Sequence, residues 1–173
     1  MGASSRAWRG VFYAFGRGMD PRGKDGVRAH PLVFCGGVLF HVGIFTAGLT
    51  LALLLGGIAL PSPARQAAVV LLAAAIASGL GLLVRRVRTP VLQAISVPDD
   101  YSSNLLVLAF LSAGLIAQLA PGAATSFAIA GAALVVYAPF SKIRHSVLFF
   151  VARARFGLFI GRRGVFARRA AGG

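Results

Sequence analysis

Long uncharged stretches separated by short basic segments dominate the chain and predict its architecture. No charged side chain occurs between Ala29 and Ala64, and a second uncharged stretch runs from Tyr101 to Ser141. A membrane-spanning helix needs about 20 largely apolar residues, so the first stretch makes one long span. The second stretch has room for two spans with a turn at Pro121 and Gly122, and the nineteen uncharged residues between Arg65 and Arg85 make a further span. We predict an all-α integral membrane protein built as an up-down four-helix bundle.

Residues at the ends of these stretches predict where each helix begins and ends. The predicted helices are Leu32–Leu60, Ala67–Val84, one that begins after the segment VPDDYSSN, and one that begins near Ala123 and carries YAPFSKIRHSVLFFVARAR at its end. Candidate N-cap residues of the third helix are Asp99, Asp100 and either Ser102 or Ser103. Pro139 could break the fourth helix, because proline removes a helical hydrogen bond.

The distribution of positive charge predicts the orientation of the four helices, because cytoplasmic loops retain Lys and Arg. The chain has 18 Lys and Arg against four acids, a net charge of +14. Six of these basic residues precede Pro31, three lie between the second and third helices, and eight lie from Lys142 onward, whereas the two other loops carry one and none. We therefore predict cytoplasmic N and C termini in the inner (cytoplasmic) membrane. This rule and anionic lipid headgroups account for the charge without a nucleic-acid partner.

Composition divides the chain into three parts. Residues 1–29 form a basic cytoplasmic or interfacial arm, residues 30–155 the four-span membrane domain, and residues 156–173 a basic cytoplasmic tail. In the arm, the segment WRGVFYAF from Trp8 to Phe15 mixes aromatic side chains with arginine, which is typical of a short helix that lies in the membrane interface. A disordered basic arm is the alternative. Membrane lipid is a predicted partner of these basic segments.

Two of the three histidines lie in or beside the first predicted helix. His30 and His41 are eleven residues apart, a spacing that places them on one helix face. Gly37 and Gly48 flank His41 on the same face. A flat, wide ligand needs the space that these missing side chains leave, so the face is a candidate binding surface.

The third histidine, His145, lies near the cytoplasmic end of the fourth predicted helix. Stepping along its helix face gives Gly131, Leu134, Ala138, Ser141 and His145. One b-type haem held between His41 and His145 explains both faces, since two axial imidazoles leave no site for oxygen and allow only electron transfer. Histidine within a membrane span is rare and usually functional. The alternative is that both histidines hydrogen-bond backbone carbonyls and adjust helix packing.

Three segments resemble the cytochrome b (gamma) subunit of respiratory nitrate reductase and its relatives. They are LFHVGIF around His41, PDDYSSNLLVLAFLSAGL on the third predicted helix and PFSKIRHSVLFFVARARFG around His145, and they cover three of the four predicted spans. The family has five spans, and this chain is similar to the last four. The resemblance implies that His41 and His145 jointly hold the haem nearer the cytoplasmic electron-transfer subunit.

The chain departs from the family at the second haem, which in the family uses a further histidine in each of the same two helices. The first of these positions falls near Leu51, and no histidine occurs from Ala123 to Arg144. We therefore expect one haem and no outer haem. This departure also puts in question the quinone chemistry that the family performs beside its outer haem.

Several polar residues near the predicted haem are further candidates for function. Lys142 and Arg144 flank the third histidine and could neutralise haem propionates or anchor the helix end to headgroups. His30, Asp100 and Tyr101 are candidates for proton exchange with a quinone, because imidazole, carboxyl and phenol groups all exchange protons. The alternatives are an ordinary interfacial position for His30, and helix capping or pairing with a cytoplasmic arginine for Asp100.

These features predict an electron-transfer subunit rather than an enzyme that acts alone. The sequence shows no nucleophile–base pair, metal cluster or Gly-rich phosphate loop, so no catalytic residue is predicted. The expected partner is a cytoplasmic iron–sulfur protein or a larger oxidoreductase complex, and the expected carrier in the membrane is a quinone. A haem-free membrane anchor for a cytoplasmic complex is the alternative. A small transporter has little support, because the spans carry no buried acid and show no inverted repeat.

Overall fold

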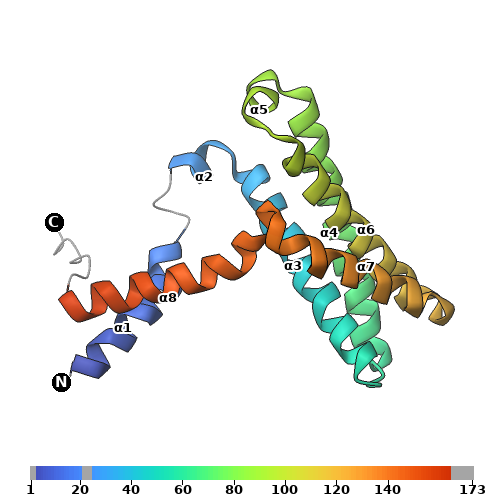
Figure 1. Cartoon of the computed structure of the whole chain (residues 1–173), viewed down its shortest axis with the longest axis horizontal. Helices are drawn as coiled ribbons and strands as arrows, with labels where there is room; N and C mark the ends of the chain where they lie inside the picture. The colour runs from blue at the N-terminus through green and yellow to red at the C-terminus, as the bar shows by residue number, and fades with distance from the viewer. Residues whose placement is uncertain (1–2, 21–24, 165–173) are drawn as a thin grey trace. The chain divides into compact units, whose positions relative to one another are not determined.

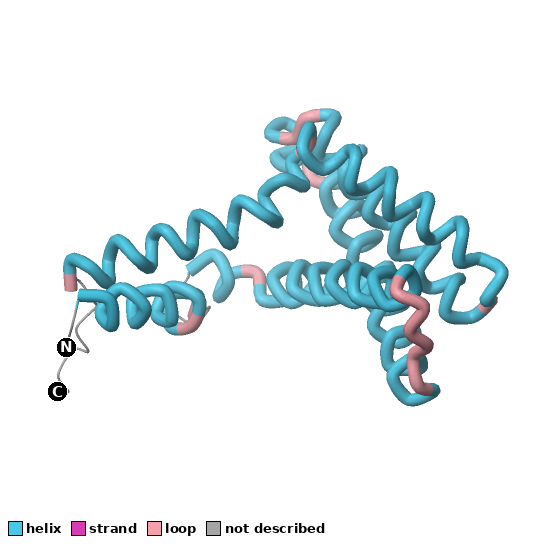
Figure 2. Tube along the Cα trace, turned by 60° about the horizontal axis from the view of Figure 1, so that its bottom comes forward, coloured by secondary structure: helices cyan, strands magenta, loops and turns pink. Residues whose placement is uncertain are grey.

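The computed structural model describes residues 3–20 and 25–164, and all regular structure within these ranges is helical (Figures 1 and 2). The α-helices are α1 (Ala3–Phe15), α2 (Asp25–Ala29), α3 (Pro31–Leu55), α4 (Ser62–Arg88), α5 (Pro90–Ile95), α6 (Pro98–Leu119), α7 (Ala124–Tyr137) and α8 (His145–Arg163). Short 3₁₀ helices are η1 (Arg17–Met19), η3 (Pro121–Ala123), η4 (Ala138–Phe140) and η5 (Lys142–Arg144). Of the basic residues counted above, Arg22 and Lys24 and those of the tail beyond Gly164 lie outside the described ranges.

Three helices of the described chain, α3, α4 and α6, are long and apolar enough to cross a membrane. The number rises to four if α7 and the helical segment that follows it form one broken span. By itself α7 has 14 residues, or about 21 Å of helix, against a hydrocarbon core of about 30 Å. The prediction of an all-helical, multi-pass membrane protein is confirmed, whereas the fourth span stays a prediction.

The observed helix ends differ from the predicted ones at several places. The first span ends at Leu55 rather than Leu60, because Gly56 and Gly57 terminate it and Gly57 adopts a positive φ of 68°. The second span is longer than predicted at both ends. The third begins at Pro98 with Val97 as its N-cap, so the predicted N-cap residues lie inside the first turns of the helix.

The predicted fourth helix is interrupted, and this overturns the helix face that was assigned to His145. The α-helix stops at Tyr137, two 3₁₀ turns follow, and a new α-helix begins at His145. Pro139 has no amide hydrogen and its ring would clash with the preceding turn of a continuous α-helix. Ser141 takes an extended conformation (φ −115°, ψ 176°). His145 therefore does not continue the helical series from Gly131, and the stepping that placed it above that column is wrong.

The chain divides into two compact units, each described here by itself. One unit is His30–Ile143, and the other joins Met1–Ala29 with Arg144–Gly173. We call them the spanning unit and the terminal unit. The predicted division into an arm, a four-span membrane domain and a tail stays a prediction.

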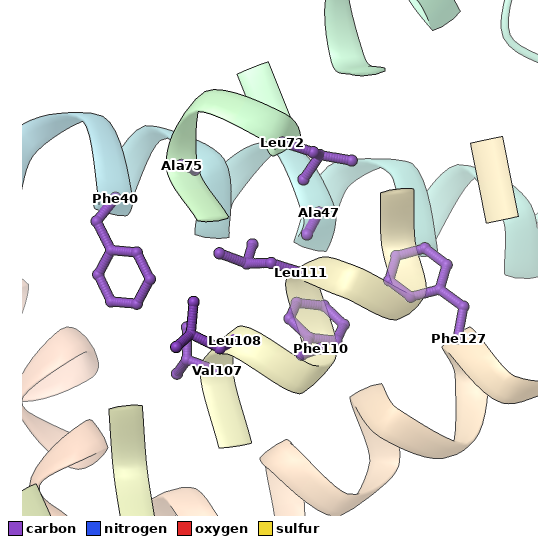
Figure 3. Packing of buried hydrophobic residues seen from close by; sticks show 9 residues of the cluster. All are labelled: Phe40, Ala47, Leu72, Ala75, Val107, Leu108, Phe110, Leu111 and Phe127. Atoms are coloured by element: carbon purple, nitrogen blue, oxygen red, sulfur yellow. The ribbon is translucent and has the colours of Figure 1, made fainter. Parts of the chain in front are cut away.

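The core of the spanning unit lies around α6, which contacts α3, α4 and α7. Figure 3 shows side chains from all four helices converging, and the largest fully buried ones are Leu72, Leu111 and Phe127. Glycine permits the close approach of α3 and α4, since a Cβ built on Gly43 would overlap the Cβ of Ala75. The Ser78 hydroxyl donates a hydrogen bond of 2.6 Å to the Gly36 carbonyl and ties the same two helices together.

In the terminal unit, α1 packs along α8 with the two backbones in direct contact. A Cβ built on Gly10 would overlap the Gly157 carbonyl oxygen and lie 2.7 Å from the Gly161 Cα. Ala7 and Ala14 are buried on the same side of α1 as Gly10. Small residues at this spacing are typical of helices that pack backbone to backbone. The segment Trp8–Phe15 is thus helical, as one of the two interpretations of the arm predicted, and its place in the membrane interface stays a prediction.

Candidate functional site

His41 lies in the middle of α3 with an exposed side chain. Its Nδ1 lies 2.7 Å from the Gly37 carbonyl oxygen, one turn earlier in the helix. Because a carbonyl oxygen only accepts, Nδ1 carries the proton of this bond. The other ring nitrogen, Nε2, then keeps the lone pair with which a neutral imidazole ligates metals. The same bond is expected if His41 has only a structural role, so the bond by itself fits both interpretations.

The helix face beside His41 leaves space for a ligand. A Cβ built on Gly37 or Gly48 would meet no atom within 4 Å. No neighbouring side chain of the described chain fills these positions, in contrast to Gly43, where α4 packs against α3. The two glycines flanking His41 therefore keep its face open, as the proposal of a wide, flat ligand requires.

An apolar groove begins one turn beyond His41 and lies between α3 and α7. Its volume is about 440 Å³. Its walls are Phe45 and Gly48 of α3, Phe110 of α6, and Gly131 and Leu134 of α7, together with neighbouring aliphatic side chains. The groove thus brings together members of the two helix faces that sequence spacing had selected separately. A Cβ at Gly131 would meet the end of the Leu51 side chain, which would have to shift.

The other two histidines are both exposed at helix starts. His30 is the N-cap residue of α3 and precedes Pro31 at the first helical position, as its sequence context predicted. His145 is the first residue of α8 and belongs to the terminal unit, whereas His41 belongs to the spanning unit. The pairing of His41 with His145 therefore stays a prediction.

A polar cluster joins three helix ends of the spanning unit. The Asp99–Asp100 cluster consists of Asp99, Asp100 and Ser103 of α6, Arg86 of α4, Tyr137 of α7, and Lys142. The Lys142 Nζ donates to both Asp100 carboxylate oxygens, at 2.8 and 2.7 Å, and the Arg86 Nη1 lies 3.2 Å from Asp100 Oδ1. Asp100 also accepts the Val97 N–H at 2.9 Å, which caps α6. Both expected roles of Asp100, capping and pairing with an arginine, are observed.

Asp99 accepts the remaining hydrogen bonds described for the same cluster. Its carboxylate accepts the Tyr137 hydroxyl at 2.6 Å, the Lys142 backbone N–H at 2.7 Å and the Ser103 hydroxyl at 3.2 Å. These bonds bring the end of α7 to the same end of the spanning unit at which α4 finishes and α6 begins. The phenol beside the acidic pair is thus Tyr137, which the sequence analysis missed, while Tyr101 is half-buried.

Lys142 and Arg144, the two candidates for contact with haem propionates, differ in their surroundings. The Lys142 ammonium is bound to Asp100, a partner that the sequence analysis assigned to arginine alone. Arg144 is exposed at the end of η5. Sequence spacing could not reveal the contact between Lys142 and Asp100, since the two residues are 42 positions apart.

Replacing Asp100 with asparagine should destabilise the spanning unit. The change removes a carboxylate that is only 11% exposed and that holds Arg86 and Lys142 together. We expect the melting temperature to fall by about 3–8 °C, because two cations then face each other without the anion between them. The measurement is thermal unfolding in detergent followed by circular dichroism. Asp25→Asn, the same chemical change in α2, is the control, and an equal melting temperature for both variants would contradict a structural role for Asp100.

No protein-family model, curated protein or solved structure matches the chain. The resemblance to the cytochrome b subunits therefore stays a hypothesis that rests on the three quoted segments.

Proposed function

We propose that this protein is a membrane electron-transfer subunit that carries one b-type haem between His41 and His145. It would pass electrons between a cytoplasmic iron–sulfur or larger oxidoreductase partner and the quinone pool. The observation that carries the proposal is the arrangement around His41. An imidazole with its Nδ1 held by the Gly37 carbonyl stands beside two open glycine positions and next to an apolar groove.

The residues of α3 suit haem ligation for three physical reasons. The Gly37 carbonyl fixes the tautomer and orientation of the His41 ring and raises the basicity of Nε2. The open positions at Gly37 and Gly48 admit a flat macrocycle against the helix. The aliphatic and aromatic walls of the groove would offer a haem an apolar environment. When bound between two histidines, haem transfers single electrons and offers no open position to oxygen.

The polar end of the spanning unit supports the proposed orientation. Arg86 at the end of α4, the start of α6 and the end of α7 are joined through the Asp99–Asp100 cluster. Arg85 and Arg88 lie in the same last turn of α4, and a basic helix end of this kind is retained in the cytoplasm. We place both termini, the partner protein and the proton-exchange candidates His30, Asp100 and Tyr101 on this side of the inner membrane.

A haem-free anchor for a cytoplasmic complex is the second candidate function. The hydrogen bond from His41 to the Gly37 carbonyl supports the anchor as much as the haem protein, because this bond satisfies the imidazole Nδ1–H without any cofactor. Under this alternative the groove between α3 and α7 would contain lipid chains or a partner helix.

Optical spectroscopy of the purified protein separates the two candidates. We expect a reduced-minus-oxidised difference spectrum of b-type haem, about one haem per chain by the pyridine haemochrome assay, and a low-spin electron paramagnetic resonance signal of two axial imidazoles. Protein produced with added haem precursor and shown to be folded by circular dichroism is the sample. A folded, colourless protein would refute the proposal, and two haems per chain would refute the single site.

A further inference from the structure

We propose that α1 and α8 form one two-helix module that binds anionic phospholipid at the membrane surface. The inference concerns the terminal unit alone and is independent of the haem. It goes beyond the expected interfacial helix, because it joins two segments from opposite ends of the chain into a single lipid-binding surface.

The two helices are held together by contacts that leave their other faces exposed. Besides the glycine contact of Gly10 with Gly157, the Arg153 guanidinium donates to the Gly18 carbonyl at 2.8 Å. The Phe15 and Phe150 rings stack with their centroids 6.2 Å apart. These contacts occupy Arg153 and the small residues, whereas Arg155, Arg162 and Arg163 of α8 are exposed.

The exposed face of α1 is aromatic. Trp8 and Phe12 are about one helical turn apart, which puts them on one side of the helix. Trp8 is 60% exposed and Phe12 is 76% exposed. Large aromatic side chains that face solvent from an arginine-bearing helix are typical of helices that lie at the boundary of headgroups and acyl chains.

The exposed face of α8 combines arginines with apolar side chains in a shallow groove. The groove has a volume of about 340 Å³ and is lined by Arg155, Leu158, Phe159, Arg162 and Arg163. The Arg163 guanidinium lies over the Phe159 ring, 4.2 Å from its centroid, and makes a cation–π contact with it. Guanidinium groups bind phosphate oxygens in pairs of parallel hydrogen bonds, and the apolar floor suits the start of an acyl chain.

Charge complementarity and chain connectivity favour a lipid surface over other anionic partners. The two helices carry six arginines and no acidic residue. The terminal unit continues directly into the spanning unit at Ala29–His30 and at Ile143–Arg144, so it is tethered to the membrane at both segments. A tethered, cationic and aromatic surface meets anionic headgroups at high local concentration.

Trp8 is the only tryptophan of the chain, which makes its fluorescence a direct reporter. The full chain is reconstituted into nanodiscs of phosphatidylcholine alone or of an equal mixture of phosphatidylcholine and phosphatidylglycerol. In the anionic discs we expect the Trp8 emission to shift to shorter wavelength and to lose about half its intensity when the lipid chains are brominated. In the neutral discs at physiological salt both effects should be much smaller. The His41→Ala variant should give the same result, which separates this test from the haem proposal.

Two variants test whether α8 contributes to the surface. The triple change Arg155→Gln, Arg162→Gln and Arg163→Gln should remove most of the effect of anionic lipid on Trp8, although Trp8 lies in α1. Gly157→Leu should do the same by separating the helices. The matched control is Arg65→Gln, Arg85→Gln and Arg88→Gln, which removes equal charge from the spanning unit and should leave the effect intact.

Three results would overturn the proposal. The first is Trp8 emission that is identical in the two lipids, as expected for a module that binds an acidic protein instead. The second is an effect of anionic lipid that is undiminished in the α8 triple variant. The third is an equal loss of the effect in the triple variant and in its control. Should Gly157→Leu fail to fold, the triple variant still decides the outcome, because its positions are exposed.

Discussion

The His41→Ala variant is expected to lose haem almost completely, with the haem content per chain reduced by about tenfold or more. In the proposed site the imidazole would supply an axial bond, and no side chain fills the glycine positions that flank it. His145→Ala should show a comparable loss if it supplies the other axial bond. The measurement is the pyridine haemochrome content of purified protein together with the reduced α-band.

Two controls make this prediction specific to ligation. His30→Ala removes another exposed imidazole, at the N-cap of α3, and should retain the wild-type haem content. Added imidazole should restore a low-spin spectrum to His41→Ala, since it can occupy the vacated axial position. Wild-type haem content in His41→Ala, or equal losses in all three single variants, would show that the imidazole is not the ligand.

The Gly43→Leu variant is expected to be the most destabilising single change in the spanning unit, by about 1–3 kcal/mol or more. Gly43 is buried where α3 meets α4, and a side chain there would overlap the Cβ of Ala75. Alanine has no rotamer through which to retreat, so the helices must separate and their shared core must loosen. Gly79 is a milder site, because the atoms its Cβ would meet are the ends of the Phe40 and Leu108 side chains.

Gly48→Leu on the same helix is the matched control, because a Cβ there meets no atom within 4 Å. It should leave the unfolding midpoint in denaturant or heat nearly unchanged. Since Gly48 lines the groove beside α7, the added leucine should still lower haem content. Equal stability of Gly43→Leu and Gly48→Leu would contradict the packing of α3 against α4. Unchanged haem in Gly48→Leu would exclude the groove as part of the haem site.

Helix existence was predictable because it depends on neighbours in the sequence. Uncharged runs of sufficient length and the flanking prolines and glycines locate α3, α4 and α6, although the predicted ends differ from the observed ones by up to seven residues. The exception was the fourth helix, where Pro139 was recognised as a possible break but the apolar composition favoured continuity. The terminal position of His145 in α8 follows from that break, and spacing along an unbroken helix could not anticipate it.

The candidate site was predictable only in its parts. Gly48 and Gly131 were each assigned to a helix face, yet only the packing of α3 against α7 shows that they line one groove. Tyr137 carried no signal in its own segment, because its partner Asp99 lies 38 residues away on another helix. The contact of Gly10 with Gly157 joins opposite ends of the chain and had no counterpart in any local pattern.

The sequence by itself determined that this is an all-helical, multi-pass membrane protein, because apolar run length is a property of consecutive residues. It also singled out His41 and its two open glycines, because helical spacing fixes which residues share a face. Only the tertiary structure decided which faces meet, that Asp100 binds Lys142 as well as Arg86, and that α1 pairs with α8. The physical reason is that helix rotation, breaks and close approach depend on the shapes of side chains that are distant in the chain.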